Sequence, residues 1–299
     1  MTLASKNPEQ HARIAIDMAQ MATSIAVQPP YFAFTSLYTL PDEWDIYGEF
    51  TPEQPRGNEQ GPLATAEAGR HLAILGSCAA ALTQPEGTRV YYLASRAQWD
   101  LRYCPIGLGQ TPSMTARAKI VEQTRKTVTA NTQLLLRGQL FAELVVSYHV
   151  LAEKTFEKLF ASHRTPASLP SGQSPYAEAL QLSVLERSKQ EITACSVGFC
   201  AARCEGHFPQ YATWPVAVIM YGMSQALSRL LDHKMRRAVS YRLSHVTLDA
   251  AELVPAARQL QFHARLSSMD DNGKYCDVVC SAAYAGRVIA TVCAEVAIE

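Results

Sequence analysis

A histidine in a tight turn and a carboxylate in an apolar helix are the two side chains of this sequence best suited to acid–base chemistry. His207 lies in the turn Gly206-His207-Phe208-Pro209. Imidazole has an unperturbed pKa of about 6.5, so His207 can accept a proton near neutral pH. Glu67 lies in the Ala/Leu/Ile-rich run 63–82, which predicts a buried helix. A carboxylate in such a helix is costly unless it has a partner or a chemical task.

The spacing after His207 carries a family resemblance. Pro215 follows His207 by eight positions, and Tyr221 follows it by fourteen and begins the run Tyr221-Gly222-Met223-Ser224-Gln225-Ala226. These residues resemble the central motif of the β-hydroxyacyl thioester dehydratases, which have the hotdog fold. In that family the turn carries the catalytic histidine, the proline opens the central helix, and a Glu or Asp stands where this chain has Tyr221.

The resemblance implies roles for the residues around the motif. The backbone N–H after the proline, here that of Val216, binds the thioester oxygen as it gains negative charge. Gln225 corresponds to the glutamine that orients the carboxyl group. The residues expected to bind substrate or support the site are Gly206, Phe208, Pro215, Val216, Tyr221, Gln225, His71 and Arg70.

The chain predicts two similar halves, each with two strands, a central helix and a run of antiparallel strands. The expected boundaries are an N-terminal hotdog unit over 1–163, a Ser/Pro/Gly-rich linker over 164–177 and a C-terminal hotdog unit over 178–299. The fold class is therefore α+β, a double hotdog. Two curled antiparallel sheets, each wrapping a central helix, would join as a pseudo-dimer.

When the two predicted central helices are aligned, Glu67 of the first half occupies the position that corresponds to Tyr221 of the second. Counting back fourteen positions from Glu67 reaches Glu53, so the first half has the acid without the histidine and the second has the histidine without the acid. In the dehydratase family one site takes its two catalytic residues from two subunits. Carried onto this chain, His207 and Glu67 form one composite site. His71, one turn after Glu67, could orient the carboxyl group, and Tyr221 fills the vacated side.

The first functional hypothesis is dehydration, or the reverse hydration, of 3-hydroxyacyl thioesters in fatty-acid or polyketide-type metabolism, which makes the protein a hydro-lyase. His207 would be the base and Glu67 the acid. Alternatives are a hotdog thioesterase in which Glu67 carries the reaction, a non-catalytic acyl-binding module, and an acyltransferase or condensing role. The substrate carrier is expected to be an acyl carrier protein or coenzyme A, docked on basic residues such as Lys234, Arg236 and Arg237. No metal or cofactor is assigned.

Composition sets limits on other functions. The formal net charge is zero, so no global basic field indicates nucleic-acid binding. No apolar run approaches the roughly 18 residues of a membrane span, and residues 1–26 lack the basic-then-apolar order of a signal peptide. Eight cysteines occur without a zinc-binding spacing, which predicts reduced, mostly buried thiols. We expect a cytoplasmic protein that could form a homodimer.

Overall fold

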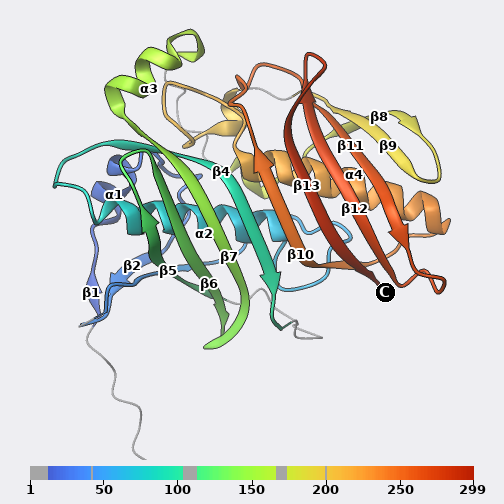
Figure 1. The fold of residues 1–299 in the computed structure, drawn as a ribbon, viewed down its shortest axis with the longest axis horizontal. Coiled ribbons are helices and arrows are strands. Elements are labelled where there is room, and N and C mark those ends of the chain that lie inside the picture. The colour runs from blue at the N-terminus through green and yellow to red at the C-terminus, as the bar shows by residue number, and fades with distance from the viewer. Residues whose placement is uncertain (1–12, 42, 104–112, 166–173, 199–200) are drawn as a thin grey trace, which may run out of the picture.

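The fold is seen in a computed structural model that describes residues 13–41, 43–103, 113–165, 174–198 and 201–299. Two long helices lie against one large antiparallel sheet (Figure 1). The helices are α1 (Met18–Ser24), α2 (Thr65–Ala81), α3 (Glu153–Leu159) and α4 (Val216–Met235), with short 3₁₀ turns at Ala161–His163, Pro175–Ala177 and Ala201–Cys204. The strands are β1 (Ile14–Ala15), β2 (Ser36–Thr39), β3 (Ile46–Phe50), β4 (Val90–Leu101), β5 (Met114–Gln123), β6 (Thr127–Leu136), β7 (Gln139–Ala152), β8 (Leu182–Arg187), β9 (Glu191–Ser196), β10 (Tyr241–Ala250), β11 (Gln261–Met269), β12 (Tyr275–Tyr284) and β13 (Arg287–Ile298).

The order of elements in the second half repeats that of the first. The short strands β2 and β3 directly precede α2 and four longer strands follow it, just as β8 and β9 precede α4 and four longer strands follow that helix. Strand β1 and helix α1 are additional elements at the start of the first half. Helix α2 packs mainly on β3, β5 and β6, whereas α4 packs mainly on β9 and β11. The first-half strands alternate buried and exposed residues, as a sheet with one covered face requires. The boundaries expected for the two units and their linker stay predictions, and residues 166–173 of that linker lie outside the described residues.

The two halves share one sheet, which corrects the expectation of two separate sheets. The described strands run in the order β1-β2-β3-β5-β6-β7-β4-β10-β13-β12-β11-β9-β8. The junction is the antiparallel pairing of β4 with β10, in which Trp99 lies opposite Val246. Pairing these strands satisfies backbone N–H and C=O groups that two separate sheets would leave exposed at their edges.

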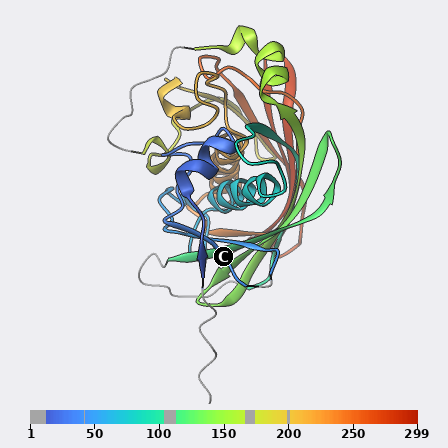
Figure 2. The ribbon, with the colours of Figure 1, turned by 90° about the vertical axis from the view of Figure 1, so that its left-hand side faces the viewer.

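The sheet curls around both long helices (Figure 2). Helices α2 and α4 contact each other, and both are covered on one side by the concave face of the sheet. Fourteen residues of α2 are buried, among them Ala66, Ala68 and Leu72. A helix enclosed in this way can be apolar on most of its surface, which explains why its sequence lacks a clear amphipathic period.

Two further expectations concern the thiols and the membrane. Among the described residues, Cys78, Cys195, Cys276 and Cys280 are free cysteines that are buried, and Cys293 is free and exposed. Cys204 is also buried. Cys104 and Cys200 lie outside the described residues. Among the helices that the structure describes, none combines the length and the apolar character needed to cross a bilayer.

Candidate active site

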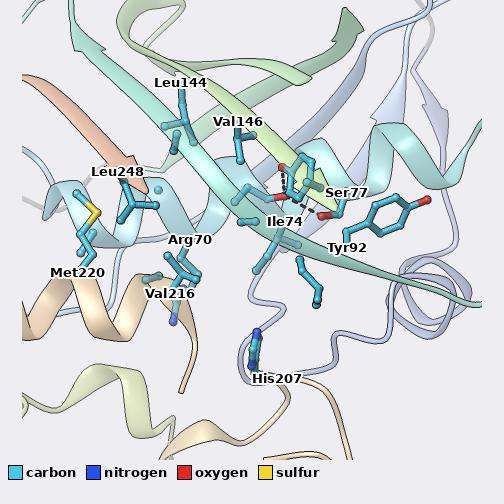
Figure 3. A pocket seen from close by; sticks show the side chains of 18 of the residues that line it. Arg70, Ile74, Ser77, Tyr92, Leu144, Val146, His207, Val216, Met220 and Leu248 are labelled. Atoms are coloured by element: carbon cyan, nitrogen blue, oxygen red, sulfur yellow. Dashed lines mark hydrogen bonds between the residues drawn. The ribbon is translucent and has the colours of Figure 1, made fainter. Parts of the chain in front are cut away.

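A mostly apolar cavity of about 110 Å³ lies between α2, the N-terminal end of α4 and the central strands β4, β7 and β10. Its wall on α2 is made of small side chains one turn apart, including Ala66, Gly69 and Ala73. Leu144 and Leu248 come from the sheet. Arg70 and His207 make one end of the cavity polar, and Ser77 and Tyr92 add hydroxyl groups at another part of its wall (Figure 3).

His207 lies at that polar end, on a turn whose shape depends on its neighbours. Gly206 has φ +84°, and Phe208 has φ +50°. The Gln28 N–H donates to the Gly206 carbonyl oxygen at 2.8 Å, so the turn is docked on the segment that follows α1. Phe208 is buried against Phe156, with ring centroids 5.4 Å apart. The turn of the second half thus reaches across to the first half, where His207 shares a cavity with residues of α2.

The imidazole of His207 is neutral in this setting. Burial lowers its pKa from 6.5 to about 3, and a hydrogen bond with the Thr213 backbone opposes this shift. Its Nδ1 atom is buried without a hydrogen-bond partner. The Tyr31 ring lies edge-on to the imidazole at a centroid distance of 5.0 Å. A neutral ring with a free nitrogen can accept a proton from a bound molecule.

The N-terminus of α4 lies beside His207. Pro215 is the N-cap residue and offers no side-chain cap. The N–H groups of Val218 and Ile219 donate to the Pro215 carbonyl, so those of Val216 and Ala217 have no intrahelical acceptor. Val216 and Ala217 both line the cavity. A carbonyl oxygen placed there would meet free N–H groups and the positive end of the helix dipole.

Glu67 is completely buried and is not among the described residues that line the cavity. Its Oε1 atom accepts the N–H of Glu53 at 2.7 Å and that of Gln54 at 3.2 Å, which ties α2 to the turn before it. Its Oε2 atom has no partner. Burial raises the pKa of Glu67, and Arg70 and the two backbone N–H groups oppose that rise. The pairing of Glu67 with His207 in one reacting site stays a prediction.

Arg70, one turn after Glu67, lines the same cavity as His207. Figure 3 shows its side chain reaching from α2 toward Val216 at the start of α4. The sequence predicts Arg70 only as a supporting residue. The sequence did contain an indication that Arg70 is a site residue: burying an arginine in an Ala/Leu/Ile helix is as costly as burying a carboxylate there.

His71 points to the other side of α2. Its ring stacks on Phe50 with centroids 3.7 Å apart, and Phe34 lies edge-on to it. Its Nε2 atom is 3.8 Å from Glu67 Oε1. Burial and the neighbouring Arg70 hold the pKa of His71 well below 6.5. His71 is therefore a neutral, packed side chain outside the cavity lining.

Tyr221 and Gln225 also lie outside the main cavity. Tyr221 lines a separate cavity of about 20 Å³, together with Gln54 and Val218. Burial raises the pKa of the Tyr221 phenol, and a hydrogen bond with Gln225 opposes this. The arrangement agrees with Tyr221 filling space on the α4 side, although its role stays a prediction.

Comparisons with known proteins identify the fold. A scan against models of protein families and a search among curated proteins matched nothing. A structure described as a conserved protein of unknown function with hot dog fold, from Alicyclobacillus acidocaldarius, superposes with a TM-score of 0.57 at 11% identity and covers 91% of this chain and 99% of its own. The chain has a hotdog fold. Two thioesterases are also similar. An acyl-CoA thioesterase II from Mycobacterium marinum has a TM-score of 0.53 at 12% identity, covering 85% of this chain and 93% of its own. A 12:0-ACP thioesterase from Umbellularia californica has a TM-score of 0.51 at 8% identity, covering 86% and 95%.

These comparisons correct the predicted activity. The sequence motif around His207 favoured a hydro-lyase, but the enzymes named among the similar structures are thioesterases, which are hydrolases. The correction has a physical side as well. A dehydratase of the expected type needs a carboxylic acid beside the histidine, and no Asp or Glu is among the described residues that line the cavity with His207.

Proposed function

We propose that this protein hydrolyses acyl thioesters, as a double hotdog with one working site per chain. The observation that carries this proposal is the polarity of the cavity in Figure 3. Its body is apolar enough for an acyl chain, and its polar end combines an unpartnered imidazole nitrogen with free helix N–H groups. These are the two kinds of group that attack on a thioester carbonyl requires.

The proposed reaction uses His207 as the base. A water molecule adds its oxygen to the thioester carbonyl carbon, and its proton passes to Nδ1 of His207. The carbonyl oxygen becomes negative and is held by the N–H groups of Val216 and Ala217. The carbon–sulfur bond then breaks, sulfur leaves as the thiol with the proton from the imidazole, and the acid remains. Such a positioned base contributes about 10²–10⁴-fold to the rate.

The first test follows thiol release and enoyl absorbance in parallel on saturated and 3-hydroxyacyl thioesters of coenzyme A and of an acyl carrier protein. We expect thiol release without enoyl formation. The His207→Ala variant should lose about 10²–10⁴-fold in kcat/KM. His149→Ala is the matched control, because His149 is exposed on β7. Absence of thiol release from every substrate would overturn the proposal.

Two more variants separate the parts of the proposal. If Glu67 rather than His207 activates the water, Glu67→Gln should lose as much activity as His207→Ala; the reaction drawn above expects a much smaller loss. Ala73→Leu gives α2 the side chain that α4 carries at Leu227 in the same register, and it fills the cavity. We expect it to abolish turnover of long-chain substrates while the protein stays folded, because the new side chain enters empty space.

A further inference from the structure

Arg70 has two hydrogen-bond donor atoms, Nε and Nη1, that no group among the described residues satisfies. The side chain is 1% exposed. Its Nη2 atom donates to Glu53 Oε1 at 2.7 Å and lies 3.2 Å from His71 Nε2. Its Nε and Nη1 atoms are buried and have no partner. The guanidinium is held in place by the ion pair and by the ring of Tyr176, whose centroid is 5.0 Å from Cζ. It is thus fixed and incompletely satisfied.

An unsatisfied charged donor is costly to bury, so a molecule that fills the cavity should supply an acceptor. A plain hydrocarbon chain supplies none. The acceptor is expected to be a neutral oxygen rather than a carboxylate, because the charge of Arg70 is already balanced. Glu53 lies at 2.7 Å, and Glu67 Oε1 lies at 3.6 Å from the same Nη2 atom. A further anion would be repelled by these carboxyl groups.

The position of Arg70 in the cavity determines which part of the ligand should carry the acceptor oxygen. Arg70 reaches toward Val216, at the end of the cavity where His207 also lies (Figure 3). The proposed reaction places the thioester carbonyl at the N–H groups of Val216 and Ala217. An acceptor for Arg70 must therefore be close to the thioester rather than far along the chain. We propose that Arg70 selects acyl thioesters that carry a keto or hydroxyl oxygen on C3, an inference that rests on the proposed hydrolysis for its orientation of the ligand.

The test compares saturated, 3-hydroxy and 3-oxo acyl-CoA thioesters of one chain length. We expect the unmodified protein to prefer one or both oxygenated substrates by about 10- to 100-fold in kcat/KM, the range of one hydrogen bond from a charged donor. Arg70→Met should abolish this preference by lowering kcat/KM for the oxygenated substrates only. Arg70→Lys keeps a positive charge for Glu53 but has no Nε and Nη1 donors, so it should fold and also lose the preference. Arg229→Met is the control, because Arg229 is a partly buried arginine of α4 that donates to the Leu182 carbonyl.

Binding of thioether analogues distinguishes failure of this inference from failure of the proposed function. The analogues keep the C3 substituent, cannot be hydrolysed, and are measured by calorimetry against all four proteins. If no thioester is hydrolysed but the 3-oxo or 3-hydroxy thioether binds in an Arg70-dependent manner, the hydrolysis fails and the role of Arg70 stands. The role of Arg70 is overturned if the unmodified protein has equal kcat/KM for the saturated, 3-hydroxy and 3-oxo substrates. It is also overturned if Arg70→Lys lowers kcat/KM by the same factor for all three substrates.

Discussion

Replacing Gly206 by alanine tests how the turn that carries His207 is held. A Cβ atom at this position would overlap the Gln28 carbonyl oxygen and lie 2.8 Å from the Tyr31 backbone nitrogen. Both neighbours are main-chain atoms, which cannot rotate away. Gly206 also has φ +84°, a conformation that alanine adopts at a cost of about 1–2 kcal/mol. The substitution should therefore push the turn away from the segment after α1.

Gly138→Ala is the matched control for the backbone conformation. Gly138 has φ +79°, and a Cβ atom there would meet nothing within 4 Å. Gly138→Ala should therefore lower the free energy of unfolding only by the cost of a positive φ for alanine, about 1–2 kcal/mol. Gly206→Ala should cost about 2–3 kcal/mol more, because the 2.8 Å hydrogen bond from Gln28 is lost and the buried contacts of the turn must repack.

Urea denaturation gives the free energies of unfolding, and thioester hydrolysis gives the functional effect. We expect Gly206→Ala to lose about 100-fold in kcat/KM under conditions where it is still folded, because a displacement of about 1 Å at a reacting group has that effect. Gly138→Ala should retain full activity. If the two variants have equal stabilities and equal activities, the docking of the turn on the α1 segment does not hold His207.

The remaining predictions concern a buried carboxyl group and a close helix contact. Burial raises the pKa of Glu59 to about 7, so its contribution to stability should fall by about 3 kcal/mol as pH rises from 4.5 to 7, and Glu59→Gln should remove this fall. Urea denaturation across this pH range checks it, with the exposed Glu122→Gln as control, which should leave the slope unchanged. In α2, a Cβ atom on Gly76 would overlap the Tyr148 hydroxyl, so Gly76→Ala should destabilise the fold by about 1–3 kcal/mol. Gly69→Ala meets nothing within 4 Å and should be neutral or stabilising by up to about 1 kcal/mol; the opposite order of melting temperatures would contradict this packing.

The sequence predicted the two long helices well because each carried its own local signals. The run 63–82, predicted as a buried helix, contains α2 (Thr65–Ala81), and α4 begins at Val216, directly after the proline that caps it. It missed α1, although Asp17 is a recognisable cap whose side chain accepts the N–H groups of Ala19 and Gln20. The pairing of β4 with β10 has no local signal, because it depends on how two edge strands meet after folding.

The rotation of α2 about its own axis is the part of the site that the sequence could not provide. Glu67 and Arg70 are three positions apart in an apolar helix, and either could face the cavity. The count from the family motif predicts that Glu67 does so. In the structure the face formed by Gly69, Arg70 and Ala73 lines the cavity, whereas Glu67 accepts hydrogen bonds from the turn before the helix. This rotation is set by the packing of α2 against β5 and β6, which the sequence of the helix alone does not encode.

The same helix face also accounts for the difference between the two halves. In the register that places Glu67 on Tyr221, each small residue of the α2 cavity wall corresponds to a large residue of α4. The pairs are Ala66 with Met220, Gly69 with Met223, Ala73 with Leu227 and Ser77 with Leu231. Met223, Leu227 and Leu231 are at most 2% exposed. These side chains therefore fill, beside α4, the space that corresponds to the open cavity beside α2. Two helices with one backbone arrangement can therefore differ through side-chain volume alone: the small side chains of α2 leave a cavity open, whereas α4 supplies core side chains and, at its N-terminus, part of the lining of that cavity.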